Sequence, residues 1–480
     1  MRRLDDHFRA SLPDLASQRP VTAPNETISD RITSVPAEFD GVRPPLRRGL
    51  FRGVPVWYHA VESQGAQYPA SRQGTPGTSD SRSTDAAAPH QRLHATPGPR
   101  RTSALFSALT DDGELFVADD AIACLQFEHY VASDGQRLTS LYYALKPLLP
   151  RGVQLELQRS NAHRRLAAAE FPRWPQDGTL DELLAALLAQ QMEVAGADSV
   201  PFVGFWPHGK RWAWCLTHDV DTAVGYDNLE PLAQAEESRN LRSAWFFVPE
   251  RYRVERGRLD DMRQRGHEVG VHGLQHSGKL FSSRQEFEKR RDRINDYIRE
   301  WGVVGFRSAS TYRNPFWLPE LDADYDTSFM DNATLEPQRG GICSVFPFML
   351  SERMVELPIT LPMDHTLINV LRQDVVEACT TKIDWVRSHH GLALSLFHPD
   401  YNTTRDRAAR YGAVLDALRA DNTGWYALPH EVAAWWQRRR RSAVVRTAHG
   451  LRVEGPAAAE ASVWQASLDG RRVRIEPVAM

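Results

Sequence analysis

The stretch Trp212–Asp221, with the sequence WAWCLTHDVD, places five apolar residues directly before a polar run that contains two aspartates. A short apolar segment bounded by polar residues is typical of a strand buried in a parallel sheet. Because parallel α/β folds build their sites where strands end, Asp219 and Asp221 are expected at such a site. One carboxylate can then act as a base while the other binds a cation. Two solvated aspartates in a turn are the alternative interpretation of this stretch taken alone.

The same pattern continues outward from this stretch, because strand-like segments alternate with amphipathic segments of helix length after residue 208. The expected strands are Trp212–Thr217, Ser243–Val248, Glu268–His272, Val303–Phe306, Met354–Pro358, Leu392–Phe397 and Trp425–Leu428. The expected helices are Leu229–Arg239, Leu259–Arg265, Gln285–Trp301, Asp374–His389, Arg405–Ala420 and Glu431–Arg440. This alternation predicts an α/β fold with a parallel sheet, open or closed into a barrel, and about 230 residues suit a (β/α) barrel.

A pair of histidines follows the third of these strands. His272 ends the apolar segment and His276 lies four residues later, a spacing that brings two imidazoles to one metal ion. Chance pairs are also expected in a chain with 17 histidines. Together with Asp221, the pair offers one oxygen and two nitrogen ligands and leaves coordination positions open. This set is typical of a catalytic rather than a structural site for a divalent metal such as zinc.

Two further polar residues follow candidate strands. Arg307 can pair with a carboxylate and hold its pKa down, and His398 can donate a proton to a leaving group. Each also has an ordinary explanation. An arginine is commonly a surface ion-pair partner, and a histidine before a proline is commonly a packed loop residue.

Five motifs occur in the order Thr217–Asp221 (THDVD), His272–His276 (HGLQH), Gly305–Arg307 (GFR), Tyr325–Phe329 (YDTSF) and Leu396–Pro399 (LFHP). This ordered set resembles the NodB-type polysaccharide deacetylases, carbohydrate esterase family 4. The resemblance covers about residues 208 to 440 and implies a distorted (β/α) barrel with an Asp-His-His triad that binds a divalent metal, usually zinc. The metal ligands that it implies are Asp221, His272 and His276. It further implies that Asp219 is the general base, Arg307 the partner of that base and His398 the general acid.

The chain departs from the family pattern in three places. Val220 separates the two aspartates, which are often adjacent in the family. Ser308–Thr311 follows the arginine, where the family usually has a proline nearby. An intermediate family motif with an Asp and a Trp is not placed, and its candidates, for which structural roles are equally compatible, are Asp326, Asp331, Asp364 and His365.

The resemblance implies a metal-dependent hydrolase that removes N-acetyl (or O-acetyl) groups from a glycan or amino-sugar substrate. Two alternatives remain open at this stage. The same site can cleave a non-sugar amide, since relatives on this fold act on small cyclic amides and arylamides. The chain can also be a catalytically inactive glycan-binding protein that takes part in polysaccharide assembly.

The chain divides into five regions by composition and pattern. Residues 1–62 have no sustained period, and residues 63–103 are rich in Ser, Thr, Pro and Gly and are expected to be a disordered linker. An accessory α+β region is expected at 104–200 and the barrel at 201–441. Residues 442–480 are expected to form a small β appendage.

Two segments of the accessory region are periodic. Val153–Leu157 alternates apolar and polar residues, which predicts a strand. Leu180 to about Val194 carries leucines on one stripe behind a start signal at Asp177–Thr179, which predicts a helix.

The composition limits the classes of partner. A net charge of −3 gives no overall basic field, so nucleic acid is not expected as a partner. Trp435 to Arg441 places four arginines behind a tryptophan pair, and we expect them to complement the end of a helix rather than to bind nucleic acid or lipid. The four cysteines are dispersed and are expected to be buried thiols. Neither a signal peptide nor a membrane-spanning segment is detected, so the expected location is cytoplasmic.

Overall fold

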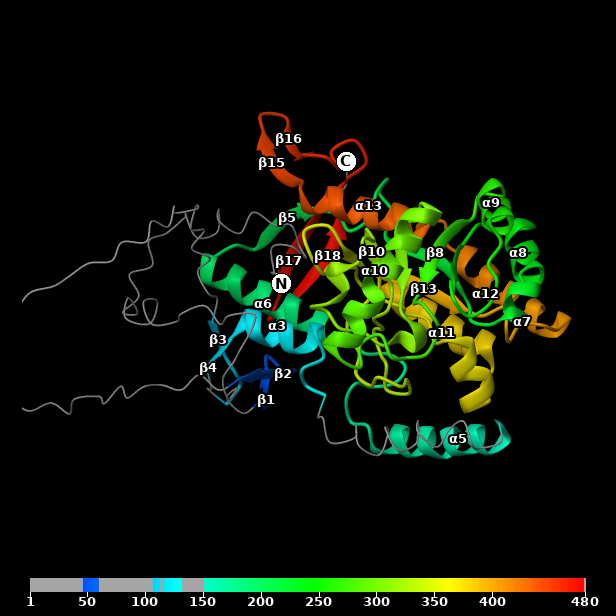
Figure 1. Ribbon diagram of the computed structural model, residues 1–480. Helices are drawn as coiled ribbons and strands as arrows, with labels where there is room; N and C mark the ends of the chain where they lie inside the picture. Colours follow the sequence, from blue (N-terminus) through cyan, green and yellow to red (C-terminus); the bar gives the residue numbers. More distant parts are fainter. Residues whose placement is uncertain (1–45, 60–106, 113–114, 132–150, 479–480) are drawn as a thin grey trace, which may run out of the picture.

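The chain is described by a computed structural model in four segments, residues 46–59, 107–112, 115–131 and 151–478 (Figure 1). The expected linker at 63–103 lies outside these described residues, as do most of the N-terminal residues before it. Across the described segments, each helix is too short or too polar to cross a bilayer. All four cysteines are buried free thiols, as expected.

A nine-stranded sheet positions the candidate site residues. Its order is β11-β12-β10-β9-β8-β7-β6-β13, and β14 pairs with the beginning of β6. Every pair is parallel except β11 with β12. The strands are β6 (Trp212–Val220), β7 (Ala244–Phe247), β8 (Glu268–His272), β9 (Gly305–Arg307), β10 (Tyr325–Asp326), β11 (Phe348–Met349), β12 (Val355–Glu356), β13 (Leu392–Phe397) and β14 (Gly424–Tyr426). All nine residues of β6 are buried, which explains why its apolar run does not alternate.

The segment after β12 connects to β13 at the other end of the sheet. The Thr360 hydroxyl donates to the Leu392 carbonyl (2.7 Å) and accepts from the Leu394 amide (2.9 Å). The backbone amides of Thr360 and Leu361 both donate to the Leu394 carbonyl, at 3.2 and 3.1 Å. The sheet is therefore curled into a distorted barrel, and the expected fold class is confirmed.

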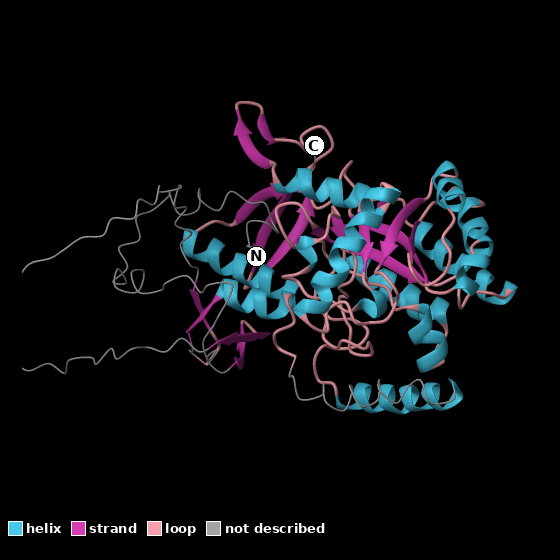
Figure 2. Ribbon diagram, viewed as in Figure 1, coloured by secondary structure: helices cyan, strands magenta, loops and turns pink. Residues whose placement is uncertain are grey.

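Helices lie around the sheet, as Figure 2 shows. They are α7 (Ala223–Asp227), α8 (Glu230–Glu237), α9 (Arg256–Gln264), α10 (Arg284–Trp301), α11 (Val375–Ser388), α12 (Arg405–Arg419) and α13 (Pro429–Arg440), and a π-helix, η5, spans His365–Leu371. The ends of α10 carry the usual capping signals. The Ser283 hydroxyl accepts from the Glu286 amide (3.1 Å) at the start of α10, and Gly302 ends this helix in the left-handed conformation.

The described residues between 46 and 195, together called the accessory region from here on, form two hairpins and three helices. The elements are β1 (Leu46–Phe51), β2 (Val54–His59), β3 (Ser107–Leu109), β4 (Leu115–Val117), α3 (Ala118–Gln126), α5 (Arg151–Ala168) and α6 (Thr179–Ala195). The expected helix near Leu180 is confirmed as α6, but the strand expected at Val153–Leu157 is wrong because this segment lies within α5. Val153 and Leu157 are four residues apart and so also share one helix face, and Leu, Gln, Glu and Arg favour a helix over a strand.

The C-terminal strands form a hairpin and part of a three-stranded sheet. They are β15 (Ala443–Thr447), β16 (Gly450–Glu454), β17 (Val463–Asp469) and β18 (Arg472–Pro477). β15 and β16 form a hairpin, whereas β17 lies between β18 and β5 (Ser199–Val203), a strand that precedes the barrel. A strand that precedes the barrel in the sequence thus pairs with a strand that follows it.

The tryptophans and arginines at the end of α13 hold this helix on the fold. Trp435 and Trp436 are buried, and the Trp435 indole N–H donates to the Phe205 carbonyl (2.8 Å). The buried Arg439 guanidinium donates to the carbonyls of Gly204 (2.9 Å) and Val203 (3.0 Å). These contacts agree with a packing role for this arginine-rich segment.

We predict that Gly270→Ala destabilises the protein while Gly257→Ala does not. An added Cβ at Gly270, in β8, would lie 2.5 Å from the Phe246 ring and 3.2 Å from the Gly305 carbonyl oxygen. Such overpacking lowers the free energy of unfolding by about 1–3 kcal/mol. Gly257 lies in α9 with no atom within 4 Å of an added Cβ, so its substitution should stabilise by about 0.5–1 kcal/mol. Urea denaturation of both variants tests this contrast, and equal stabilities would contradict it.

Candidate active site

The six residues expected at the site are brought together at one end of the parallel sheet. Asp219 is the last but one residue of β6, His272 ends β8 and Arg307 ends β9. Asp221 follows β6, His276 follows β8 and His398 directly follows β13. Since the carboxyl ends of parallel strands meet at one edge, residues up to 179 positions apart in the sequence become neighbours (Asp219 and His398).

Three side chains form a group that could hold a metal ion. The Asp221 Oδ1 atom lies 3.0 Å from Nε2 of His276 and 3.3 Å from Nε2 of His272. Ligand atoms of the three residues all lie within 4.8 Å of one another. Gly273 and His276 both adopt positive φ angles, 58° and 52°, so the backbone turns sharply between the two imidazoles. The left-handed conformation at His276 is costly for a residue with a Cβ and is typical of functional positions.

The tautomer of His272 indicates why a cation fits this group. Its Nδ1 atom lies 3.1 Å from the Arg307 carbonyl oxygen, so Nδ1 carries the hydrogen and donates it. In the neutral ring, Nε2 is then a bare lone pair that faces the Asp221 carboxylate. Both His272 Nε2 and Asp221 Oδ1 are buried without a hydrogen-bond partner in the described structure. Two acceptors that face each other in a buried place require a proton or a metal ion between them.

The neighbouring charges favour the charged forms of both Asp221 and His272. Burial raises the pKa of the Asp221 carboxyl, but the neighbouring His276 and His272 imidazoles outweigh burial and hold this pKa well below its usual range. Burial lowers the pKa of His272, and the nearby carboxylates of Asp219 and Asp221 raise it above its ordinary value. A proton and a metal ion would therefore compete for Nε2 of His272.

Arg307 is fully buried and fixes Asp219. Its Nη1 donates to Oδ1 of Asp219 (2.8 Å), its Nη2 to the hydroxyls of Thr217 (2.9 Å) and Thr327 (3.0 Å), and its Nε to the Thr327 carbonyl (2.9 Å). The guanidinium also lies 4.6 Å above the Phe246 ring. Because Oδ1 of Asp219 is used by Arg307, the other oxygen, Oδ2, remains for the site and lies 3.5 Å from His272 Nε2.

His398 is held by an aspartate that the sequence left unplaced. Its Nδ1 lies 2.7 Å from Oδ1 of Asp364, and Oδ2 of Asp364 accepts from the His398 amide (2.8 Å) and from Asn402 Nδ2 (2.6 Å). This geometry leaves Nε2 of His398 for exchange of a proton. Burial lowers the pKa of His398, but Asp364 outweighs it, together with Asp221 and Asp219, and the result is a pKa of about 10.

The other three candidates for the intermediate motif have structural contacts. Asp326 accepts from the amide (3.1 Å) and hydroxyl (2.8 Å) of Ser328, and Asp331 forms a buried ion pair with Lys382. The His365 ring contacts the Tyr401 ring, with centroids 5.2 Å apart. Position alone did not separate Asp364 from these residues, because it lies in an irregular segment before η5.

Sequence reasoning missed Asp400, which joins the loop of His398 to the loop of Asp221. Its Oδ2 accepts from the Asp221 amide (3.1 Å), and its Oδ1 accepts from the Thr222 amide (3.1 Å) and hydroxyl (2.5 Å). Asp400 lies two residues after His398, so a second carboxylate in the motif His-Pro-Asp was the available signal. Its contacts fix the backbone that carries Asp221 relative to the backbone that carries His398.

The loop after Arg307 is strained. Ser310 and Thr311 adopt φ angles of 56° and 53°, and each such residue costs about 1–3 kcal/mol. The next residue, Tyr312, packs near the histidine loop, since a Cβ added to Gly278 would lie 3.0 Å from its ring. This loop therefore contributes a half-buried tyrosine beside the segment that carries His276.

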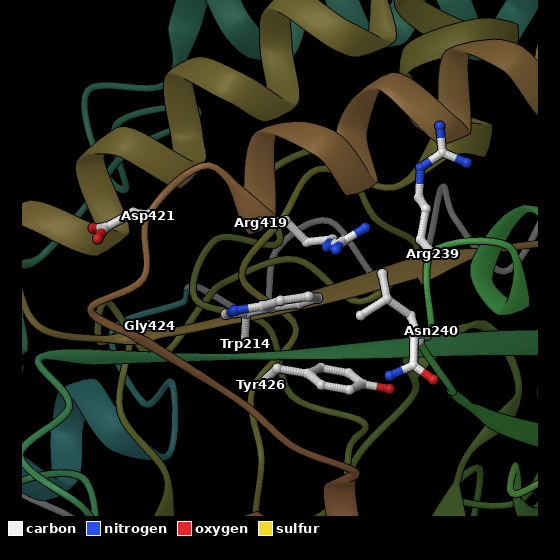
Figure 3. A pocket seen from close by; sticks show the side chains of 8 residues that line it. Trp214, Arg239, Asn240, Arg419, Asp421, Gly424 and Tyr426 are labelled. Atoms are coloured by element: carbon white, nitrogen blue, oxygen red, sulfur yellow. The ribbon is translucent and has the colours of Figure 1, made fainter.

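A separate cavity of about 250 Å³ lies near the beginning of β6, away from the candidate site, and Figure 3 shows its lining side chains. It is lined by Trp214, Arg239, Asn240, Leu241, Arg419, Asp421, Gly424 and Tyr426. Arg239 is bound by both oxygens of Asp416 (2.8 and 3.0 Å), and the Tyr426 hydroxyl donates to the Arg242 carbonyl (2.6 Å). These polar groups are occupied by the fold, and the cavity contains none of the six candidate residues.

A comparison with models of known families found one match, which covers a segment of the chain. Residues 210–318 match the family model described as polysaccharide deacetylase. The matched range includes Asp219, Asp221, His272, His276 and Arg307, whereas His398 lies beyond it. This match agrees with the resemblance that the ordered motifs indicated. A comparison with curated proteins found no match.

A comparison with solved structures found similar chains. A putative polysaccharide deacetylase from Mycobacterium smegmatis is 18% identical, with 48% of this chain and 91% of that chain covered and a TM-score of 0.40. A probable polysaccharide deacetylase from Pseudomonas aeruginosa PAO1 is 13% identical, with 49% and 93% covered and a TM-score of 0.40. The Puue allantoinase is 11% identical, with 49% and 93% covered and a TM-score of 0.41.

We predict that Asp364→Asn lowers the pKa of His398 in the metal-free protein from about 10 toward its ordinary value. A histidine pKa that is raised by folding stabilises the protein fully below about pH 6.5, and this stabilisation is lost as the pH rises to about 10. The wild type should therefore lose stability over this range more steeply than the variant. NMR titration of the imidazole and denaturation at several pH values measure both effects. Asp384→Asn, at an exposed aspartate, is the control and should change neither; an unchanged His398 titration in Asp364→Asn would refute the assignment.

Proposed function

We propose that the protein is a metal-dependent hydrolase that removes N-acetyl (or O-acetyl) groups from a glycan or amino-sugar substrate. One observation carries the proposal: Asp221 Oδ1 and His272 Nε2, which are buried without a hydrogen bond, converge beside His276, with Asp219 and His398 next to them. The family match of residues 210–318 supports the same reaction class.

We propose Asp221, His272 and His276 as the metal ligands and zinc as the metal. One carboxylate oxygen and two imidazole nitrogens suit zinc, and three protein ligands leave room for water and substrate. The chemistry that such an ion supplies is polarisation of the acyl carbonyl and acidification of water. The Asp221 and His276 side chains are 12% and 16% exposed, against 1% for His272, so substrate approaches from the side of Asp221 and His276.

Asp219 is the proposed general base. Arg307 holds Oδ1, so Oδ2 takes the proton from the attacking water. A base in this role has to be held rigidly, because small displacements of reacting groups cost large factors in rate. The four hydrogen bonds of the Arg307 guanidinium provide this rigidity.

His398 is the proposed general acid. Its pKa of about 10 keeps the imidazole protonated at neutral pH, so Nε2 has a proton to give to the departing amine or alcohol. Asp364 holds the ring in place through Nδ1. The presence of both an acid and a base favours turnover over the alternative of an inactive glycan-binding protein. A non-sugar amide remains the second substrate class for the same machinery.

We predict about one zinc or other divalent ion per chain in protein purified without a histidine tag. Asp221→Ala and His272→Ala should abolish binding because each removes one of three ligands. His389→Ala, at an exposed histidine, should retain the ion. Mass spectrometry of metal content, followed by zinc titration, provides the measurement. If the wild type contains no divalent metal and takes none up on titration, the proposed metal site is wrong.

We predict that Asp219→Asn and His398→Ala each lower kcat by about 10²- to 10⁴-fold, because each removes one proton-transfer group. The assay is acetate release from a panel of acetylated oligosaccharides and simple amides. Asp384→Asn should retain full turnover, and the metal content of each variant shows whether its site is intact. Wild-type turnover in either catalytic variant would refute its role.

A further inference from the structure

The accessory region reaches the loop that follows Arg307 through a buried ion pair. Glu128, just after α3, binds the guanidinium of Arg313 through both carboxylate oxygens; the Nε–Oε2 distance is 2.8 Å. The Arg313 side chain is fully buried and that of Glu128 is 6% exposed. The two residues are 185 positions apart in the sequence. A buried charged pair of this kind is bound strongly to one geometry, because either charge alone would be left unpaired.

The same carboxylate also holds a second loop. Oε1 of Glu128 accepts from the Gly341 amide (2.7 Å), and the hydroxyl of Tyr130 donates to the Gly341 carbonyl (2.6 Å). Gln338 joins this loop to the first one, since its Oε1 accepts from the Arg313 amide (2.8 Å) and its Nε2 donates to the Arg313 carbonyl (3.1 Å). Residues 128–130 therefore fasten two loops of the barrel to the accessory region.

The first of these loops is the strained segment beside the candidate site. Nη1 of Arg313 donates to the Thr311 carbonyl (2.9 Å), directly after the two left-handed residues Ser310 and Thr311. A strained backbone persists only where its surroundings determine it fully. Glu128 orients the guanidinium, the guanidinium holds Thr311, and Tyr312 is thereby placed against Gly278 in the loop of His276.

We propose that Glu128 is a positioning residue of the hydrolase site: it fixes residues 308–314, which connect Arg307 to the tyrosine beside the histidine loop. This inference rests on the proposed function. It assigns the accessory region a task in the same site, because a carboxylate from outside the family-matched range 210–318 completes the support of a loop inside it. The site is thus incomplete without the segment around residue 128.

The test compares Glu128→Gln with Glu193→Gln. Glu193 also pairs with an arginine, Arg52, but both belong to the accessory region and Glu193 is half-exposed, so it is a matched control. Three quantities are measured in the full chain: kcat and KM for 4-nitrophenyl acetate and for an acetylated chitooligosaccharide, the zinc affinity, and amide hydrogen exchange in residues 308–314. Assays are run well below the melting temperature of each variant.

We expect Glu128→Gln to lower kcat/KM on the order of 10²-fold, as misplacement of a site by about 1 Å does. Exchange in residues 308–314 should become faster while zinc affinity stays within about twofold, which a general loss of stability would not produce. Glu193→Gln should match the wild type in all three quantities. Wild-type kcat/KM or unchanged exchange in Glu128→Gln would overturn the proposal.

A second variant covers failure of Glu128→Gln to fold. Tyr130→Phe removes only the hydroxyl that binds the Gly341 carbonyl, and it should show the same changes in smaller degree. Unchanged kcat/KM and exchange in this variant would then overturn the proposal. If the wild type binds zinc but turns over none of the substrates, the proposed function fails; faster exchange in Glu128→Gln would still establish that Glu128 holds the loop.

Discussion

The buried guanidinium of Arg307 is the constraint on which the candidate site depends. A fully buried charge is tolerated only when it is paired and its hydrogen-bond donors are satisfied. Arg307 meets this requirement through Asp219 and Thr217 of β6 and through Thr327, directly after β10. These partners come from strands on both sides of β9. The guanidinium therefore links the carboxyl ends of β6, β9 and β10. The orientation of Asp219 follows from this pairing.

The long irregular segment between β10 and β11 connects the barrel to the accessory region through polar contacts. Asp331 in this segment pairs with Lys382 of α11, whose ammonium also donates to the Pro175 carbonyl (2.5 Å). The Leu180 amide, at the start of α6, donates to the Cys343 carbonyl (2.9 Å). An irregular segment has no ladder to satisfy its backbone, so partners from elsewhere must do so. The accessory region supplies many of them, which explains why it packs directly on the barrel.

The sequence predicts the barrel well because its signals are local. The apolar runs of β6, β8 and β13 lead directly into polar residues, among them Asp219, His272 and His398. The supporting residues of the site that the sequence does not reveal act through contacts between residues far apart in the sequence. Glu128 meets Arg313 across 185 positions, and Asp364 meets His398 from a segment with no periodic pattern. The α5 helix was missed for a different reason, since apolar residues at i and i+4 fit both a strand and a helix.

The balance of charge at the site points to what its last partner is. Asp219 has a permanent cation in Arg307, and the protonated His398 has a permanent anion in Asp364. Within the described residues, the Asp221 carboxylate forms its ion pairs with the imidazoles of His272 and His276, and His272 already donates its Nδ1 hydrogen to a backbone carbonyl. A carboxylate this deeply buried needs a positive charge, and protons on the imidazoles supply it only where the pH allows. A divalent cation held by Asp221, His272 and His276 would supply this charge and would leave a net positive charge beside the proposed base and acid. Such a charge would stabilise the negative charge that develops on an acyl carbonyl oxygen, so the charge requirement of the buried aspartate and the proposed hydrolysis would have the same physical origin.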